Sequence, residues 1–193
     1  ARVRAEAAAE AEAEAAAEAE AEAAAAAAAA PAAGPRLVYT SSYDRGLEHM
    51  LRHGWPLVSK AVPTATLHLY YGWETHELLH PASAWRDGMK ELIASLAPSV
   101  IDHGRVGQPE LLAAKARSHL HYYVGDWPEI DCIAVRESAM LGCVPLTSRT
   151  AVFGDKEKDY CVRVPGDPTL PSVQRAAAAE AIRLLAHFEI GRA

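Results

Sequence analysis

Two glutamates, Glu129 and Glu137, stand eight residues apart in a segment that ends with Gly142 and Pro145. The apolar pattern from about residue 131 predicts a helix, with Asp131 as its N-cap and Gly142 as the left-handed residue that ends it. Eight residues span about 12 Å of helix, so the two carboxylates are too far apart to share one proton or one metal ion. They could instead hold the two ends of one elongated ligand that is rich in hydroxyl groups.

The start of this predicted helix is suited to an anion. The first amides of an α-helix have no partner within the helix and lie at the positive end of its dipole. The amides of Cys132, Ile133 and Ala134 could therefore donate to a phosphate. A nucleotide-sugar has the matching layout, with sugar hydroxyls at one end, a diphosphate in the middle and a ribose diol at the other end.

The segment resembles the Glu-x7-Glu signature of the retaining GT-B glycosyltransferases known as the group 1 family. Glu129, Glu137 and Gly142 fall in register with it, whereas Ser138-Ala139-Met140 replaces the usual Ala-Met-Ala and Pro145 comes one residue late. By this resemblance Glu129 is catalytic and binds hydroxyls of the donor sugar, and Glu137 accepts both ribose hydroxyls. The implied reaction transfers a sugar from a nucleotide-sugar to an acceptor with retention of anomeric configuration, without a metal ion or other cofactor.

The turn at residues 41–46 is similar to the first donor-side turn of that family, which contacts the diphosphate. Arg45 is the candidate to bind and stabilise the departing diphosphate, because a guanidinium forms paired hydrogen bonds with phosphate oxygens. Ser42 or the amide of Gly46 would assist. The residue after Gly46 is not the lysine usual in the family, and Lys60 is the candidate for that second cation from its position along the chain alone.

Residues 100–106 resemble the strand and turn that precede the Glu-x7-Glu unit in the family, where the nucleobase is bound. By this resemblance His103 and Arg105 lie near the donor, with the arginine beside the base. A histidine at the end of a strand is also common as a purely structural residue, so both roles of His103 stay open.

Two other functions remain as alternatives. A non-catalytic module that binds a nucleotide or nucleotide-sugar would share the same candidate residues. The segment His76-Glu77-Leu78-Leu79-His80 satisfies the H-E-x-x-H spelling of zinc peptidases, in which both histidines lie on one helix face. Pro81 follows directly and disfavours helical geometry at His80, which argues against a zinc metallohydrolase.

Short strand-like and helix-like segments alternate after residue 35. This alternation predicts an α/β domain with a Rossmann-like parallel sheet and helices on both faces, which is also one half of a GT-B fold. Strands are expected at residues 36–40, 66–71, 100–106, 119–124, 144–147 and 159–164, and helices at residues 47–53, 83–96, 109–117, 131–141 and 172–190.

Composition divides the chain into two parts. The first 33 residues are almost entirely Ala and Glu, and they hold two of the 19 basic and seven of the 25 acidic residues. We expect an Ala/Glu-rich leader or linker at residues 1–35 and a nucleotide-sugar-binding domain at residues 36–193. The 17 basic and 18 acidic residues that remain after residue 33 do not form the strongly basic surface of a nucleic-acid-binding protein.

The resemblance covers residues 37–185 and implies that the acceptor-binding half of the enzyme, usually N-terminal, is absent from this sequence. The expected partners are a nucleotide-sugar donor and an unknown acceptor, and we expect the isolated chain to be inactive alone. Three cysteines without C-x-x-C spacing, and no signal peptide or membrane span, favour a cytoplasmic location. The acidic residues of 154–160 are expected to form a solvated turn rather than a metal site.

Overall fold

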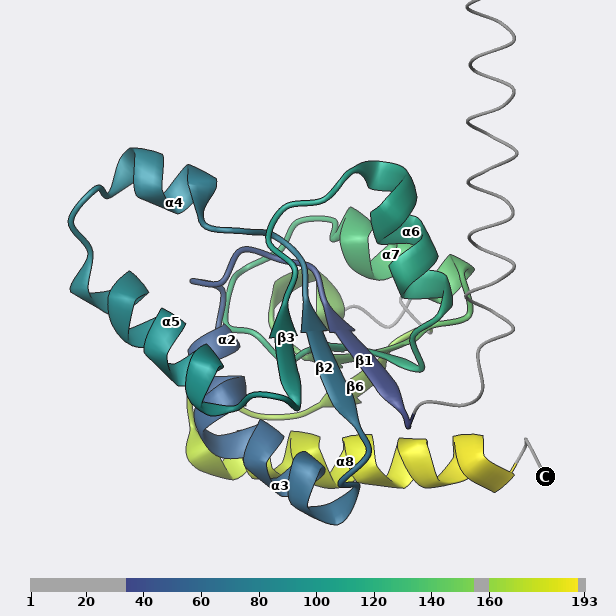
Figure 1. Ribbon diagram of the computed structural model, residues 1–193. Coiled ribbons are helices and arrows are strands. Elements are labelled where there is room, and N and C mark those ends of the chain that lie inside the picture. The colour runs from purple at the N-terminus through teal and green to yellow at the C-terminus, as the bar shows by residue number, and fades with distance from the viewer. Residues whose placement is uncertain (1–33, 155–159, 191–193) are drawn as a thin grey trace, which may run out of the picture. The chain divides into compact units, whose positions relative to one another are not determined.

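The computed structural model describes residues 34–154 and 160–190 (Figure 1). Most of the leader predicted at residues 1–35 and most of the acidic turn predicted at residues 154–160 therefore lie outside the described residues. From Gly34 onward the chain forms a six-stranded parallel sheet in the order β3-β2-β1-β4-β5-β6. This order confirms the predicted Rossmann-like α/β class.

Strands and helices alternate along the chain as the sequence predicts. The strands are β1 (Arg36–Tyr39), β2 (Thr66–Leu69), β3 (Val100–Asp102), β4 (Leu120–Tyr123), β5 (Val144–Ser148) and β6 (Val162–Val164). The helices are α2 (Leu47–His49), α3 (Trp55–Ala61), α4 (Glu74–Leu79), α5 (Ala84–Ser95), α6 (Gln108–Ala116), α7 (Ile133–Met140) and α8 (Pro171–Ile190), with a π-helical turn η1 (Met50–Gly54) and a 3-10 turn η2 (Ala151–Gly154).

The structure corrects several predicted boundaries, and two of them bear on the candidate site residues. The first helix does not end at His53 but continues through η1 and α3 to Ala61. Pro56 is accommodated because it lies in the first turn of α3, where its missing N–H is not needed. The strand predicted at residues 100–106 ends at Asp102, since Gly104 has a left-handed φ of 67° that an extended strand does not contain.

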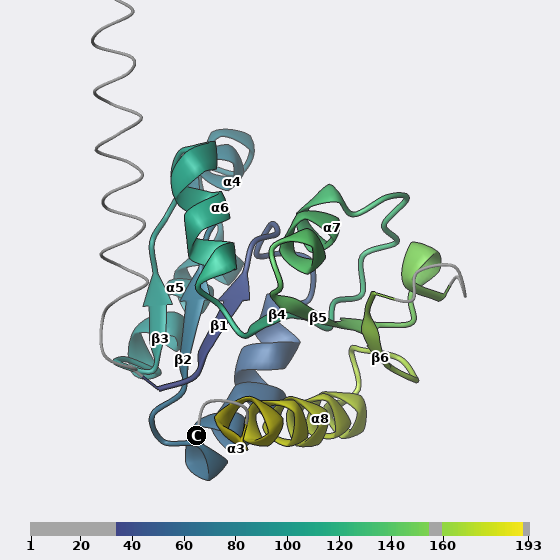
Figure 2. The ribbon, with the colours of Figure 1, turned by 90° about the vertical axis from the view of Figure 1, so that its right-hand side faces the viewer.

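The two faces of the sheet are covered by different helices. His121 and Tyr122 are neighbours on β4, so their side chains point to opposite faces. His121 Nδ1 lies 2.8 Å from Ser138 Oγ of α7, whereas the hydroxyl of Tyr122 lies against Gly54 at the end of η1. Figure 2 shows the same division, with α6 and α7 on one side of the sheet and α3 and α8 on the other.

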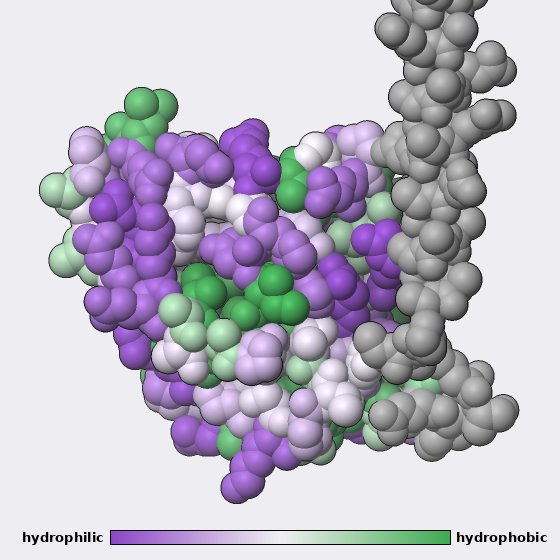
Figure 3. Space-filling model, in the orientation of Figure 1, coloured by the Kyte–Doolittle hydropathy of each residue, from purple (hydrophilic) through white to green (hydrophobic). Residues whose placement is uncertain are grey.

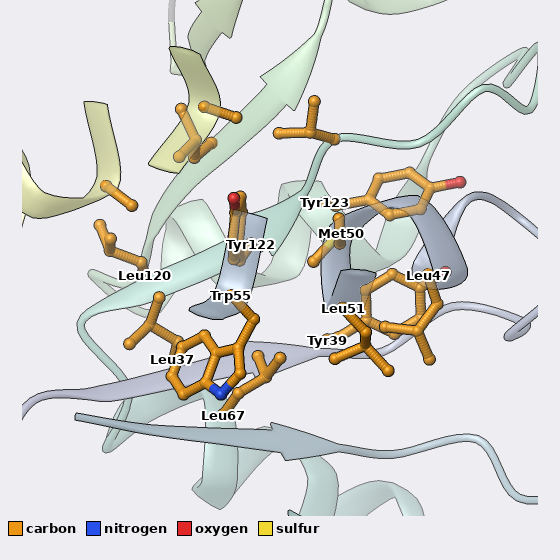
Figure 4. Packing of buried hydrophobic residues seen from close by; sticks show 14 of the residues in the cluster. Leu37, Tyr39, Leu47, Met50, Leu51, Trp55, Leu67, Leu120, Tyr122 and Tyr123 are labelled. Atoms are coloured by element: carbon orange, nitrogen blue, oxygen red, sulfur yellow. The ribbon is translucent and has the colours of Figure 1, made fainter. Parts of the chain in front are cut away.

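The larger apolar cluster lies on the face that carries η1, α3 and α8. Trp55 is fully buried there beside Leu37 and Leu67 (Figure 4). Its Nε1 donates to Ser99 Oγ at 3.0 Å, which satisfies the one polar group of the ring. This packing holds the first helix rigidly behind β1 and so fixes the turn at the end of that strand.

Helix α8 is the longest of the described helices, at 20 residues. Ala177, Ala181 and Leu185 face the core, and Arg183 pairs with Glu180 at 2.6 Å on the opposite, exposed side. Such a division between two faces is typical of a helix that packs on a globular domain. Within the described part of the chain, α8 included, no helix has both the length and the apolar character needed to cross a membrane.

Candidate functional site

The candidate site lies where the strand order reverses. β1 and β4 are neighbours at the centre of the sheet, and the chain leaves β1 toward β2 on one side and β4 toward β5 on the other. In an open parallel sheet the crevice beyond the carboxyl ends of such a pair is the usual place for a ligand. The turn at residues 41–46 follows β1, and the loop at residues 124–132 follows β4, so the predicted residues of both segments meet at this point.

Two glycines bring the two loops into direct contact. Gly46 has a φ of 88°, and a Cβ at this position would lie 2.8 Å from the Cα of Gly125. A Cβ at Gly125 would in turn lie 2.3 Å from the carbonyl oxygen of Arg45. Since neither position has room for a side chain, the sequence needs glycine at both for the loops to approach each other. Ser148 Oγ also donates to the Gly125 carbonyl at 2.8 Å, which fixes the second loop to β5.

Arg45 and Glu129 meet between these two loops. Arg45 Nη1 lies 2.9 Å from Glu129 Oε1, and the hydroxyl of Tyr123 donates to the same oxygen at 2.7 Å. Burial, and then the hydrogen bond to Glu129, raise the pKa of Tyr123, so this hydroxyl remains a donor at neutral pH. The guanidinium carbon of Arg45 also lies 4.8 Å from the ring centre of Trp127, a cation–π contact.

The side chains of this pair are only partly accessible. Arg45 is 31% exposed and Glu129 is 11% exposed. Both of these hydrogen bonds reach Oε1, and neither of them engages Oε2. An arginine and a carboxylate held in this way can bind phosphate oxygens and sugar hydroxyls side by side.

Helix α7 begins one residue later than the sequence predicts. Cys132, not Asp131, is the N-cap, and the carboxylate of Asp131 instead pairs with Arg136 at 3.0 Å. Three residues of irregular chain separate Glu129, which pairs with Arg45, from the first residue of the helix. Burial raises the pKa of the Cys132 thiol to about 11, so it is a neutral, apolar cap.

Of the three amides predicted to start this helix, those of Ile133 and Ala134 belong to its first turn, and that of Cys132 belongs to the N-cap. Val135 N and Arg136 N both donate to the carbonyl oxygen of Cys132. The amides of Ile133 and Ala134 precede them, in the first turn, where an α-helix supplies no internal acceptor. At its other end α7 closes as predicted, since Gly142 has a φ of 79° and Cys143 N donates back to the carbonyl oxygen of Ser138 at 2.9 Å.

Glu137 lies within α7 and is held by two residues of α6. Lys115 Nζ lies 2.6 Å from Glu137 Oε2, and Gln108 Nε2 donates to Oε1 at 3.1 Å. The Glu137 side chain is 27% exposed, whereas that of Lys115 is fully buried. Glu129 therefore lies on the loop before α7, whereas Glu137 lies in the second turn of the helix.

His103 and Arg105 follow β3, at the same edge of the sheet as the other candidates. The His103 ring stacks on Tyr70 at 4.4 Å with an interplanar angle of 3°, and Nε2 lies 2.8 Å from His68 Nδ1. Burial lowers the pKa of His103, which favours the neutral ring. Arg105 is exposed, and its backbone packs against Gly72 in the loop after β2.

The remaining two candidates differ in their placement. The carbonyl oxygen of Ser42 accepts from Arg45 N at 3.1 Å and from the Tyr39 hydroxyl at 2.8 Å, so Ser42 shapes the turn that carries Arg45. Lys60 is exposed near the end of α3. That helix runs back to the amino ends of the strands, where Thr66 starts β2, so Lys60 lies at the opposite edge of the sheet and is not brought together with the others (Figure 1).

Four residues of the site are not predicted from the sequence: Lys115, Gln108, Tyr123 and Trp127. Tyr123 belongs to an apolar strand, where an aromatic residue is expected in the core. Lys115 does leave a signal, because it shares the helical spacing of Leu111, Ala114 and Ser118 and so lies on the face of α6 that must be buried. A lysine on such a face needs a buried acceptor.

The H-E-x-x-H segment lies away from this site, on α4. The helix ends at Leu79 as predicted, and His80 is its C-cap with φ −135°. Glu77 is engaged by Lys90 at 2.8 Å, and Leu78 and Leu79 are exposed at the tip of α4, where hydrophobic residues are visible in Figure 3. Within residues 34–154 and 160–190, no three His, Cys, Asp or Glu side chains form a group that could hold a metal ion.

No family model matches the sequence, and no curated protein matches it. Solved structures do match the fold. An α,α-trehalose-phosphate synthase (UDP-forming) from Burkholderia xenovorans has a TM-score of 0.57 at 13% identity, over 78% of this chain and 36% of that one. HepE from Anabaena in complex with UDP-glucose has a TM-score of 0.54 at 12% identity, over 79% and 45% of the two chains.

The catalytic domain of starch synthase IV from Arabidopsis thaliana, bound to ADP and acarbose, has a TM-score of 0.56 at 12% identity, over 81% of this chain and 32% of that one. The present chain thus spans less than half the length of each of these three structures. At this level of identity the likeness shows the fold. The described chain has the Rossmann-like fold of one half of a GT-B glycosyltransferase.

Proposed function

We propose that this chain is the donor-binding half of a retaining GT-B glycosyltransferase, and that the nucleotide-sugar lies across the switch point between β1 and β4. The observation that carries this proposal is the contact of Arg45 with Glu129 at 2.9 Å, beside the first amides of α7. The cation and the helix N-terminus suit the diphosphate of such a donor. The carboxylate beside them suits the hydroxyl groups of its sugar.

Each candidate residue has a distinct role in this proposal. Arg45 binds the diphosphate, with the amides of Ile133 and Ala134 donating to its other oxygens. Glu129 accepts from hydroxyls of the sugar through Oε2, while Tyr123 and Arg45 hold Oε1. Glu137 accepts the two hydroxyls of the ribose, and the exposed ring of His103 lies on the side of the nucleobase.

The transfer itself needs little acid or base chemistry from this half of the enzyme. The bond between the anomeric carbon and the departing phosphate oxygen breaks, and the acceptor hydroxyl bonds to the same face of that carbon. The acceptor proton passes to the departing phosphate. Arg45 stabilises the negative charge that develops on the diphosphate, which is the interaction expected to lower the barrier.

The class of donor is proposed from the ligands of two of the similar solved structures. HepE is described with UDP-glucose and starch synthase IV with ADP, so a nucleoside diphosphate is the common part, with either base. Since this chain spans less than half of those proteins, we propose that the acceptor is bound by a part of the enzyme outside the present sequence. The chain alone should then bind donor without transferring sugar efficiently.

Calorimetric titration of UDP and ADP into the full chain tests the proposal. Saturable binding of one of them, tighter when a sugar is attached, is the expected result. Binding of the nucleotide with no contribution from any sugar would favour a non-catalytic nucleotide module. A failure of both nucleotides to bind would contradict the proposed donor site.

A further inference from the structure

Lys115 is a fully buried lysine on α6. Its side chain is 0% exposed, and Nζ donates to Glu137 Oε2 at 2.6 Å and to the carbonyl oxygen of Ala134 at 3.1 Å. Both partners belong to α7, the helix that carries Glu137. Because burial of an ammonium group is costly unless it is paired and hydrogen-bonded, these two contacts account for the position of the Lys115 side chain.

Stability alone does not explain a buried ion pair at this position. A buried pair can often be replaced by apolar residues of similar volume without loss of stability. Lys115 lies on the buried face of α6 with Ala114, where an apolar residue could pack. Glu137, in contrast, is 27% exposed, so the pair joins a buried cation to a carboxylate that reaches the surface.

The contacts fix the direction of the Glu137 carboxylate. Lys115 holds Oε2, and Gln108 donates to Oε1 at 3.1 Å. The Ala134 carbonyl accepts a second hydrogen bond from Lys115, which favours one position of the ammonium group beside α7. A carboxylate restrained at both oxygens before a ligand arrives loses less entropy on binding, and each oxygen can still accept another hydrogen bond.

We propose that Lys115 is a positioning residue that holds the Glu137 carboxylate in the orientation that accepts the two ribose hydroxyls of the donor. This inference rests on the proposed function, in which Glu137 binds the ribose. Lys115 does not itself reach the donor, since its side chain has no exposed surface. Its replacement should therefore act through Glu137 and only on ligands that carry the 2′- and 3′-hydroxyl groups.

The test compares a ribonucleoside diphosphate with its 2′,3′-dideoxy analogue by calorimetry on the full chain. UDP and ADP are titrated first, and the tighter of the two is used with its own analogue. The unaltered chain should prefer the ribonucleotide by roughly tenfold or more, the scale of hydrogen bonds to a charged group. Lys115→Met, which keeps the apolar stem, should reduce this preference to below about threefold and leave affinity for the analogue within about twofold.

Lys90→Met is the matched control, because Lys90 also pairs with a glutamate at 2.8 Å but on the surface. It should keep the full preference for the ribonucleotide. If circular dichroism shows that Lys115→Met is unfolded, Lys115→Gln replaces it, since the amide fills similar volume and lacks the charge; its preference should fall as well.

The outcomes separate this inference from the proposed function. A folded Lys115 variant that keeps the ribonucleotide preference, or that loses affinity equally for both ligands, overturns the positioning role and leaves the donor site standing. An unaltered chain that binds both ligands equally well overturns the ribose role of Glu137, and the role of Lys115 with it. Absence of binding by UDP and ADP overturns the proposed function itself.

Discussion

Arg45 Nη1 lies 2.9 Å from Glu129 Oε1, so a cation from the loop after β1 meets a carboxylate from the loop after β4. The two residues are 84 positions apart in the sequence, and the close approach of Gly46 to Gly125 brings their loops together. Each charge offsets the other while no donor is bound. A ligand that engages both must therefore present an anion to Arg45 and hydroxyl groups to Glu129.

Replacement of Arg45 by alanine should weaken the binding of a nucleoside diphosphate. Loss of hydrogen bonds to a charged group costs about 1.5 to 3 kcal/mol, which is a large change in a calorimetric titration. Arg52→Ala is the matched control. Arg52 also pairs with a glutamate, Glu48, at 2.8 Å, but on the surface of the helix that follows the Arg45 turn. Equal affinities of the Arg45 and Arg52 variants would remove Arg45 from the site.

Gly46→Ala should destabilise the chain, whereas Gly88→Ala should not. A left-handed conformation costs a residue with a side chain about 1 to 2 kcal/mol, and the new Cβ at position 46 would also meet the backbone of Gly125. Gly88 lies inside α5, and a Cβ there would meet no atom within 4 Å, so alanine should stabilise the helix by about 0.5 to 1 kcal/mol. Urea unfolding of both variants measures the difference. A neutral effect of Gly46→Ala would contradict the close contact of the two loops.

Stability should fall in acid because of His121. Burial, and then the charge of Lys115, lower the pKa of His121 from 6.5 to about 3. Between these values the unfolded chain binds a proton that the folded chain does not, so the free energy of unfolding decreases as the pH falls through this window. Urea unfolding at about pH 7 and at about pH 5 should show this loss, and His121→Asn should reduce the difference between the two.

The control for that experiment is His80→Asn, which alters an exposed histidine outside the sheet. It should leave the difference in stability between the two pH values unchanged. The comparison uses that difference rather than the stability itself, because a change at a buried residue can also lower stability at every pH. An unchanged pH dependence in His121→Asn would show that His121 is not responsible.

Nucleoside diphosphate binding should persist when divalent metal ions are removed. In the proposed donor site, Arg45 and the amides at the start of α7 take the place of a metal ion beside the diphosphate. Calorimetry in excess chelator, compared with the same titration in magnesium, measures the effect. Complete loss of binding in chelator would favour a metal-dependent donor site.

Much of the fold could be predicted from local patterns. The alternation of strands and helices indicated the parallel sheet, because each short apolar strand must be covered on both faces. The continuation of the first helix to Ala61 was missed because Gly54 and Pro56 usually interrupt helices. The π-helical turn at Met50–Gly54 absorbs that irregularity, and it depends on packing against α8 that no local pattern contains.

The site was only partly predictable for a similar reason. Arg45, Glu129 and Glu137 belong to short motifs whose residue types suggest their chemistry. The partners that hold them, Tyr123 and Lys115, lie on other elements and become neighbours through the fold. Lys60 was proposed from its position along the chain alone. That position does not determine whether a residue on a helix lies at the carboxyl or the amino ends of the strands.

The most direct measurement compares two glutamate variants with two ligands. Glu137→Ala and Glu129→Ala are each titrated with the nucleoside diphosphate and with the same nucleotide carrying a sugar, beginning with UDP and UDP-glucose. If Glu137 binds the ribose, its variant should lose about 1.5 to 3 kcal/mol of binding free energy for both ligands. If Glu129 binds the sugar, its variant should bind the free nucleotide at least as tightly as the unaltered chain, because Arg45 is no longer paired with a carboxylate. It should lose the added affinity that the sugar confers on the donor. Equal losses in the two variants for the sugar-free nucleotide would contradict the separate roles of Glu129 and Glu137. No loss in either variant for either ligand would contradict the proposed donor site.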